Sequence, residues 1–223
     1  MIRDSWAILI KDLQLDLKRL ENFFSMLFFT ITILLIFAFA LPQDLSKQID
    51  VLAGMYWISF LLSGILSLNK SFQHEKENGC IHALLISPVG RGAIFLGKMF
   101  ASVIFILIVQ GLVIPIFGIL FNSLAISFFP ELMLLSLLAS LGFASLGTLL
   151  AGLTSDIRFK EILLPLLLFP LLVPLLLACV RITQHILGGS GLLVSADWVR
   201  LLVGFDLFFL IVAYLTFEFV MEL

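Results

Sequence analysis

Six long apolar blocks divide this chain, and none of them contains a lysine or an arginine. They cover residues 23–41, 51–68, 99–121, 132–153, 162–180 and 201–220. A helix needs about 20 residues to cross a hydrocarbon core of about 30 Å, and each block is close to that length or longer. The blocks are continuously apolar and lack the two-residue alternation of barrel strands, so they predict helices. We therefore expect an all-α integral membrane protein with six transmembrane helices.

The overall composition agrees with this class. Hydrophobic residues make up 61% of the chain and charged residues only 13%, whereas a soluble domain carries about a quarter charged residues. A water-soluble globule is therefore excluded. The net charge of -2 excludes nucleic-acid binding as a main role, because that needs many Lys and Arg contacts to phosphates. Cys80 and Cys179 fall in a polar loop and an apolar block, so we expect no disulfide between them.

The lysines and arginines predict the orientation of the chain, because cytoplasmic loops of membrane proteins are enriched in them. Lys47, Arg181 and Arg200 lie on one predicted side of the membrane. The other ten of the 13 lie on the opposite side: Arg3, Lys11, Lys18, Arg19, Lys70, Lys76, Arg91, Lys98, Arg158 and Lys160. We predict that both termini are cytoplasmic.

Residues 1–22 predict an amphipathic helix that lies in the cytoplasmic interface, ahead of a permease domain over 23–223. Its apolar face is formed by Trp6, Leu9, Ile10, Leu13, Leu17 and Leu20, spaced by three and four residues. Lys11, Gln14 and Lys18 lie opposite, and Ile8 and Leu15 interrupt this polar face. The pattern leaves two interpretations open. The helix is either an elbow that packs along a transporter subunit or an ordinary juxtamembrane anchor.

The loop over 69–92 is the only predicted cytoplasmic loop long enough to fold. It joins a charged run to a short apolar turn, and Ser87-Pro88 ends that turn. A soluble motor needs such an element to push on a membrane subunit, although a solvated loop with a charge run would show the same pattern. The residues assigned to coupling with an ATPase are Phe72, Glu75, Glu77, Gly79, Leu84, Leu85, Ser87 and Pro88.

Two runs of residues resemble a known family. The first run is Glu75-Lys76-Glu77-Asn78-Gly79, followed by 84–89 and by Gly97-Lys98, and it resembles the first cytoplasmic loop of type 2 ABC transporter permeases. Within that superfamily, 93–98 and the proline-spaced segment 164–174 resemble the CcmB family specifically. The resemblance covers the whole chain. His82 is a departure, because the family commonly carries an acidic residue there.

The resemblance implies a permease subunit in the bacterial cytoplasmic membrane that serves c-type cytochrome biogenesis. It would pair with a CcmA-like ATPase, beside CcmC-like and CcmD-like membrane subunits and a CcmE-like haem chaperone, and it allows a homodimer within the complex. ATP hydrolysis by the ATPase would drive haem export or release of haem-loaded CcmE. ATP would be bound by the partner subunit, haem is a candidate cargo, and membrane lipid surrounds the chain.

The alternative is a non-transporting membrane scaffold or conformational relay in the same complex. A polar cavity lined by the third, fifth and sixth helices would favour transport, and a dry, tightly packed interior would favour the relay.

The residues themselves indicate that this chain is not an enzyme. Neither Gly97-Lys98-Met99 nor the glycines at 188–191 have the spacing of a phosphate-binding loop, so the motor must be another chain. There is no Cys-x-x-Cys-His haem attachment motif, and we interpret His185 as a polar interfacial residue rather than a haem ligand.

Asp206 and Glu218 are the carboxylates within the predicted spans, and they are too far apart on one helix to form a catalytic dyad. We expect Asp206 to form an interfacial pair with Arg200, with a functional proton or cargo site as the alternative.

Two structural features are predicted for individual helices. The fourth helix carries a four-residue repeat of small residues, which lets the backbone of a neighbour approach closely. Its members are Ser136, Ser140, Ala144, Thr148 and Gly152. The fifth helix contains Pro165, Pro170 and Pro174, each of which removes a backbone donor and clashes with the preceding turn. We expect this helix to be kinked or broken.

Overall fold

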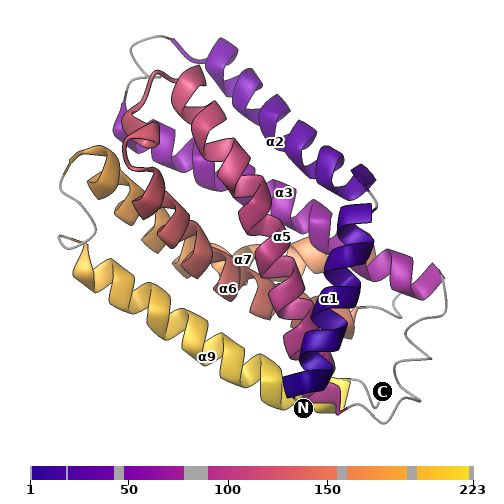
Figure 1. Cartoon of the computed structure of the whole chain (residues 1–223). Helices are drawn as coiled ribbons and strands as arrows, with labels where there is room; N and C mark the ends of the chain where they lie inside the picture. The colour runs from indigo at the N-terminus through magenta and orange to yellow at the C-terminus, as the bar shows by residue number, and fades with distance from the viewer. Residues whose placement is uncertain are drawn as a thin grey trace.

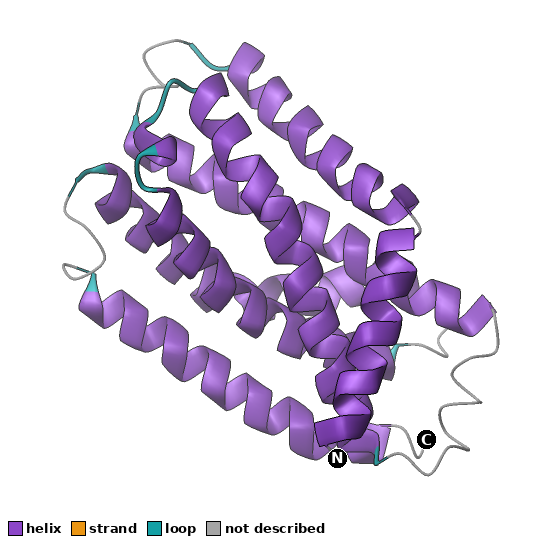
Figure 2. Ribbon diagram, in the orientation of Figure 1, coloured by secondary structure: helices purple, strands orange, loops and turns teal. Residues whose placement is uncertain are grey.

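The computed structural model describes residues 2–18, 20–42, 48–77, 90–154, 160–189 and 195–220. Every regular element within these ranges is a helix (Figure 2). The elements are α1 (Ile2–Lys18), α2 (Leu20–Ala40), α3 (Ile49–Glu77), α5 (Arg91–Leu120), the short 3-10 helix η1 (Leu124–Ile126), α6 (Phe129–Leu153), α7 (Lys160–Leu187) and α9 (Ala196–Val220).

The six predicted membrane spans are confirmed. Helices α2, α3, α5, α6, α7 and α9 are each long and apolar enough to cross a bilayer. The main difference from the prediction is the start of the third span, because α5 begins at Arg91 and not at residue 99. The amides of Ala93 and Ile94 donate to the Gly90 carbonyl at 2.8 and 3.3 Å, so the helix is already formed there.

The helices form one bundle in which α3 and α6 are the most buried spans and α2 and α9 the least. Figure 1 shows α2 along one edge, α9 along the opposite edge, and α1 crossing in front of α5 at one end of the bundle. The start of α1 and the end of α9 lie at that same end, which we call the α1 end. The interior is a continuous cluster of buried apolar side chains, with a smaller cluster at the α1 end that includes Ile8, Phe95, Ala144 and Phe217.

Two helix ends are closed by residues in the left-handed conformation. After α5, Asn122 has φ 46°, and the amides of Asn122 and Ser123 return to the carbonyls of Ile119 and Gly118. After α7, Gly189 has φ 79° and donates to the Ile186 carbonyl at 3.0 Å. Glycine and asparagine tolerate this conformation, and such bonds satisfy carbonyls that the end of a helix leaves unpaired. These caps fix where the chain turns back into the bundle.

Helix α7 continues through all three of its prolines, so it is bent at most and not broken. Pro170 and Pro174 lie on its exposed face, and Pro165 is half-buried. The opposite face, which includes Leu164, Leu168, Leu172 and Leu175, is fully buried in the bundle. The bend itself stays a prediction.

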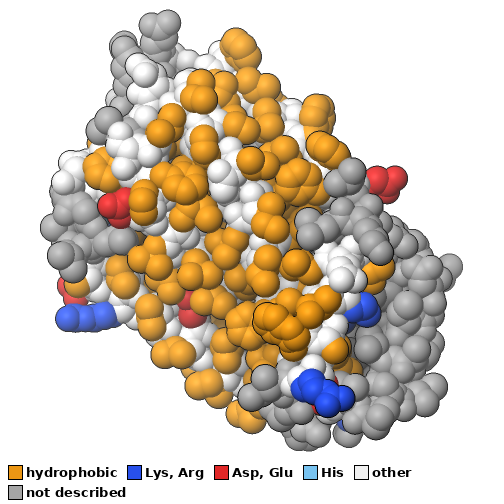
Figure 3. All heavy atoms as spheres, viewed as in Figure 1, with side chains coloured by type: hydrophobic (Ala, Val, Ile, Leu, Met, Phe, Trp, Pro, Cys, Tyr) orange, Lys and Arg blue, Asp and Glu red, His pale blue; other side chains and the backbone are white. Residues whose placement is uncertain are grey.

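The outer surface of the bundle is apolar over most of its length. Large hydrophobic side chains such as Phe28, Phe39 and Leu166 are more than half exposed. Figure 3 shows hydrophobic side chains covering the middle of the visible face, with lysine and arginine side chains toward its margins. A surface of this kind would aggregate in water and is stable in lipid, where the outer side chains lie against acyl chains.

The predicted orientation can be tested with reporter fusions. Fusions of a fluorescent protein after the first and the last residue should fluoresce, because both ends are predicted to be cytoplasmic. Alkaline phosphatase inserted within 43–47, between α2 and α3, should be active, because this enzyme needs the external compartment to form its disulfides. Fusions without fluorescence at both termini and an inactive phosphatase at 43–47 would reverse the orientation.

Candidate functional site

The segment predicted to meet an ATPase is framed by two helices. Phe72, Glu75 and Glu77 lie on the last turns of α3, and α5 begins just after the segment at Arg91. The apolar span of α3 ends at Leu68 and the helix continues for nine residues to Glu77, which is about 13 Å. Gly79, Leu84, Leu85, Ser87 and Pro88 lie outside the described residues. A force applied to this segment would therefore act directly on α3 and α5.

The first turns of α5 are held on two sides by close contacts at glycines. A Cβ on Gly97 would lie 2.8 Å from Ile8 of α1, and one on Gly92 would lie 2.7 Å from the ring of Tyr214 of α9. Real Cβ atoms are not found so close to other atoms, so α1 and α9 approach here because these positions carry no side chain. Helix α5 is thus packed between α1 and α9 directly after the segment predicted to meet an ATPase.

A buried ion pair reinforces the contact between α1 and α5. Lys98 Nζ lies 3.5 Å from Asp12 Oδ2, and Lys11 Nζ lies 3.0 Å from Asp12 Oδ1. The Lys98 side chain is only 5% exposed. Removing one member of a buried pair leaves the other charge without compensation, which is strongly destabilising. The pair therefore holds the two helices in one register.

The face of α1 that packs on α5 differs from the face that stood out in the sequence. Ile8, Leu9 and Asp12 are buried, whereas Trp6 and Ile10 of the predicted apolar face are exposed. In the sequence Ile8 only interrupted a polar face, and Asp12 gave no signal. The one available signal was Gly97, a small residue where another helix could approach. The elbow interpretation stays a prediction, in which the exposed Trp6 and Ile10 would lie in the lipid interface.

Buried hydrogen bonds join four helices toward the other end of the bundle. Tyr56 of α3 donates its hydroxyl to Gln110 Oε1 of α5 at 2.7 Å and lies 3.0 Å from Ser136 Oγ of α6. Trp57 of α3 donates to Thr183 Oγ1 of α7 at 2.8 Å. Polar side chains in a membrane interior have few other partners. These bonds fasten α3, α5, α6 and α7 into one block.

All five residues of the predicted small-residue repeat are buried, namely Ser136, Ser140, Ala144, Thr148 and Gly152. They do not share one neighbour. Ser136 contacts Tyr56 of α3, whereas Ala144 lies in the cluster that contains Phe95 of α5 and Phe217 of α9. A four-residue repeat drifts around a helix of 3.6 residues per turn, which explains the change of partner. Its role in close packing stays a prediction.

The expected pair between Asp206 and Arg200 is wrong. Arg200 Nη1 instead contacts Asp197 Oδ1 at 3.1 Å, and both side chains are exposed. Residues three apart lie on nearly the same helix face, whereas residues six apart lie about 120° apart. Asp206 points into the bundle and is only 7% exposed. The sequence showed that it lies within a span but not which face it occupies.

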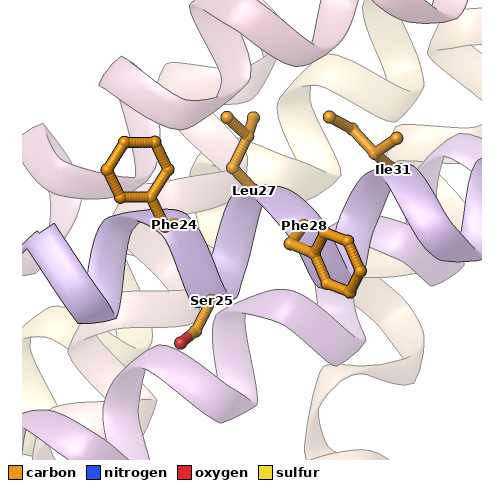
Figure 4. Close-up of a pocket in the computed structure, with 5 residues that line it drawn as sticks. All are labelled: Phe24, Ser25, Leu27, Phe28 and Ile31. Atoms are coloured by element: carbon orange, nitrogen blue, oxygen red, sulfur yellow. The ribbon is translucent and has the colours of Figure 1, made fainter.

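Two remaining features give no catalytic arrangement. His185 lies near the end of α7 and is half-buried, and no group of three potential metal ligands occurs in the part of the chain that the structure describes. Figure 4 shows a pocket on α2 that is lined by Phe24, Ser25, Leu27, Phe28 and Ile31. It is an open apolar depression on the surface of one helix. It does not have the position or polarity expected of a solute path between the third, fifth and sixth spans.

Comparison with known proteins identifies the family. The family described as CcmB protein matches residues 3–222, which is nearly the whole chain. The chain belongs to the CcmB family. Heme exporter protein B of Rhodobacter capsulatus is 30% identical over 87% of this chain and 88% of its own length.

Two further relatives carry the same name. Heme exporter protein B of Paracoccus denitrificans is 30% identical over 77% of this chain and 78% of its own length. That of Pseudomonas aeruginosa is 26% identical over 76% of each chain. With its six spans and these bacterial relatives, this CcmB family member is a multi-pass protein of the bacterial inner membrane.

The ion pair of this CcmB family member can be tested by charge reversal. Lys98→Asp should lower the free energy of unfolding by about 3 kcal/mol, because a second carboxylate would then be buried beside Asp12 in place of the buried Lys98 ammonium. Lys11→Asp at the partly exposed neighbour is the matched control and should cost about 1 kcal/mol or less. The free energy is measured by unfolding the detergent-purified chain in dodecyl sulfate. The exchanged pair Asp12→Lys with Lys98→Asp should recover part of the loss, and equal losses in the single and double variants would contradict the assignment.

The packing of α6 can be tested at Ala144, which is fully buried against the α1-end cluster. Ala144→Leu should destabilise the chain by about 1–3 kcal/mol, because the added carbons have no space in a packed interior. Ala40→Leu, on the exposed end of α2, should change stability by less than about 0.5 kcal/mol. The readouts are the yield of monodisperse protein and its unfolding midpoint. An Ala144→Leu protein with wild-type yield and midpoint would show that α6 has room here.

Proposed function

We propose that this chain is the membrane-spanning permease subunit of an ABC transporter complex for c-type cytochrome biogenesis. A separate CcmA-like ATPase would supply the energy, beside CcmC-like and CcmD-like subunits. The observation that carries the proposal is the match to the CcmB family over residues 3–222. The relatives named Heme exporter protein B support haem as the cargo.

The division of labour is supported by the chain itself. Its sequence has no glycine-rich loop that ends in Gly-Lys-Ser or Gly-Lys-Thr, which a nucleotide-hydrolysing subunit needs to hold phosphates. ATP is therefore bound by the partner, and this subunit converts motion into work on haem or on a haem-loaded CcmE-like chaperone.

The geometry supports a route for that motion. A motor can move a membrane subunit only through an element that protrudes from the bilayer and is stiff. Helix α3 extends past its apolar span as a continuous helix, and α5 starts directly after the coupling segment. The first turns of α5 are packed against α1 and α9 through Gly97 and Gly92. A displacement of the coupling segment would thus move α5, and α1 and α9 would move with its first turns.

A second candidate is a relay that transmits ATPase motion to partner proteins and has no solute path of its own. The packing of α3, α5, α6 and α7 favours it, because their facing side chains form one continuous buried cluster. Hydrogen bonds also satisfy Tyr56, Trp57 and Thr183 inside that cluster. Reconstituted vesicles separate the two. Haem accumulation by this chain with the ATPase alone indicates transport, whereas ATP-dependent release of the CcmE-like chaperone without haem movement indicates the relay.

The coupling assignment predicts which substitutions separate the ATPase from this subunit. Leu84→Asp or Leu85→Asp should weaken co-purification of the ATPase by at least about 30-fold, because apolar anchors dominate such interfaces. Glu75→Ala or Glu77→Ala should weaken it less, and the difference from the wild type should shrink at high salt, because salt already screens exposed charges.

Ile157→Asp is the matched control. It lies in the other predicted cytoplasmic loop, between α6 and α7, and this variant should retain the ATPase. Membrane insertion is checked by yield in washed membranes. Retention of the ATPase by both leucine variants, with loss in Ile157→Asp, would place the docking site in the loop after α6.

A further inference from the structure

Asp206 is an isolated carboxylate deep in a membrane span. It is the eleventh residue of α9, so it lies about 15 Å along the helix from Ala196. The residue is 93% buried. Neither Oδ1 nor Oδ2 has a hydrogen-bond partner within the part of the chain that the structure describes.

The carboxylate is enclosed by α6 and α7. Asp206 Oδ1 occupies the space that a Cβ on Gly142 would fill, and Leu175 packs against the same point. Cys179 of α7 is the nearby titratable group. The α6 span contains no lysine or arginine, and Arg181 of the α7 span is exposed and donates to Gln184 Oε1 at 3.3 Å. Gly142 therefore permits the close approach of α9 but offers the carboxylate no partner.

The unpaired Asp206 carboxylate destabilises the contact between α6 and α9. A buried polar group without a hydrogen bond is destabilising, and more so when it is charged. The neighbouring polar groups differ, since Tyr56 and Trp57 are hydrogen-bonded to other helices. An arrangement in which water reaches Asp206 would remove the penalty, so this carboxylate favours opening of the α6–α9 contact.

Helix α9 is not part of the block that the hydrogen bonds of Tyr56 and Trp57 join. It is one of the two least buried spans. It is also connected to the input of motion. Tyr214 of α9 packs on Gly92, and the centroid of the Phe217 ring of α9 lies 5.2 Å from that of Phe95. Gly92 and Phe95 are in the first turns of α5.

We propose that the seam between α6 and α9 at Gly142 and Asp206 opens during the ATP-driven cycle and admits water to the carboxylate. The inference rests on the proposed function, because it takes its driving motion from the ATPase. Asp206 is a positioning residue in this account. It lowers the stability of the closed seam so that a modest displacement of α5 is enough to open it.

Cysteine labelling tests the seam directly. Leu202→Cys and Ala213→Cys place reporters on the buried face of α9 in a cysteine-free chain, and Leu172→Cys on α7 is the control within the block. A charged, membrane-impermeant thiol reagent is applied to the complex with the ATPase, before and after trapping with ATP and vanadate. Labelling at one or both α9 positions should rise about tenfold or more on trapping, and Leu172→Cys should stay unlabelled.

Two substitutions separate polarity from a merely structural role. Asp206→Leu should abolish the rise in labelling and raise the unfolding midpoint of the isolated chain, because the closed seam no longer buries a polar group. Asp206→Asn keeps an unpaired polar group and should keep the rise.

ATP hydrolysis is measured in the same samples. ATP hydrolysis without any rise in labelling, or an undiminished rise in Asp206→Leu, would contradict the opening of the seam and leave the proposed function intact. A complex that does not form or does not hydrolyse ATP would contradict the proposed function.

Discussion

Lipid offers no hydrogen bonds, and this constraint determines how the whole molecule is built. Each span satisfies its backbone within a helix, so the polar side chains inside the bundle must bond to one another or to backbone carbonyls. Tyr56, Gln110 and Ser136 do so across three helices, as Trp57 and Thr183 do across two. These bonds and the apolar cluster around them make α3, α5, α6 and α7 one stiff block. A stiff block would suit the proposed transmission of motion from an ATPase.

The two helices that pack on the start of α5 are held in the bundle differently. At the α1 end, α5 is held by contacts that require glycine and by the Asp12–Lys98 pair, so α1 follows α5. Helix α9 also contacts α5 there, but its inward face carries the unpaired Asp206. The same displacement of α5 would therefore move α1 as part of a unit and separate α9 from α6. The difference between the α1–α5 contact and the α6–α9 contact would determine which helices separate when α5 moves.

The sequence predicts the features that are local in the chain. The six spans follow from apolar length, and the absence of a nucleotide loop follows from a short motif. The start of α5 was missed because Lys98 looked like a membrane boundary, whereas Asp12 of another helix compensates its charge. The predicted pairing of Asp206 with Arg200 was wrong, because the composition of an apolar block does not show which face of the helix a residue occupies. Contacts such as Ile8 on Gly97 depend on how distant helices meet, which one sequence does not contain.

Motion of α5 would carry α1 with it and separate α9 from α6. Spin-label distances in the ATPase-bound complex test this claim most directly, with labels at the exposed positions Trp6 on α1, Leu112 on α5, Leu134 on α6 and Leu207 on α9. On trapping with ATP and vanadate, the account predicts an unchanged distance between Trp6 and Leu112 and a longer distance between Leu134 and Leu207. A changed distance between Trp6 and Leu112 with a fixed distance between Leu134 and Leu207 would contradict it.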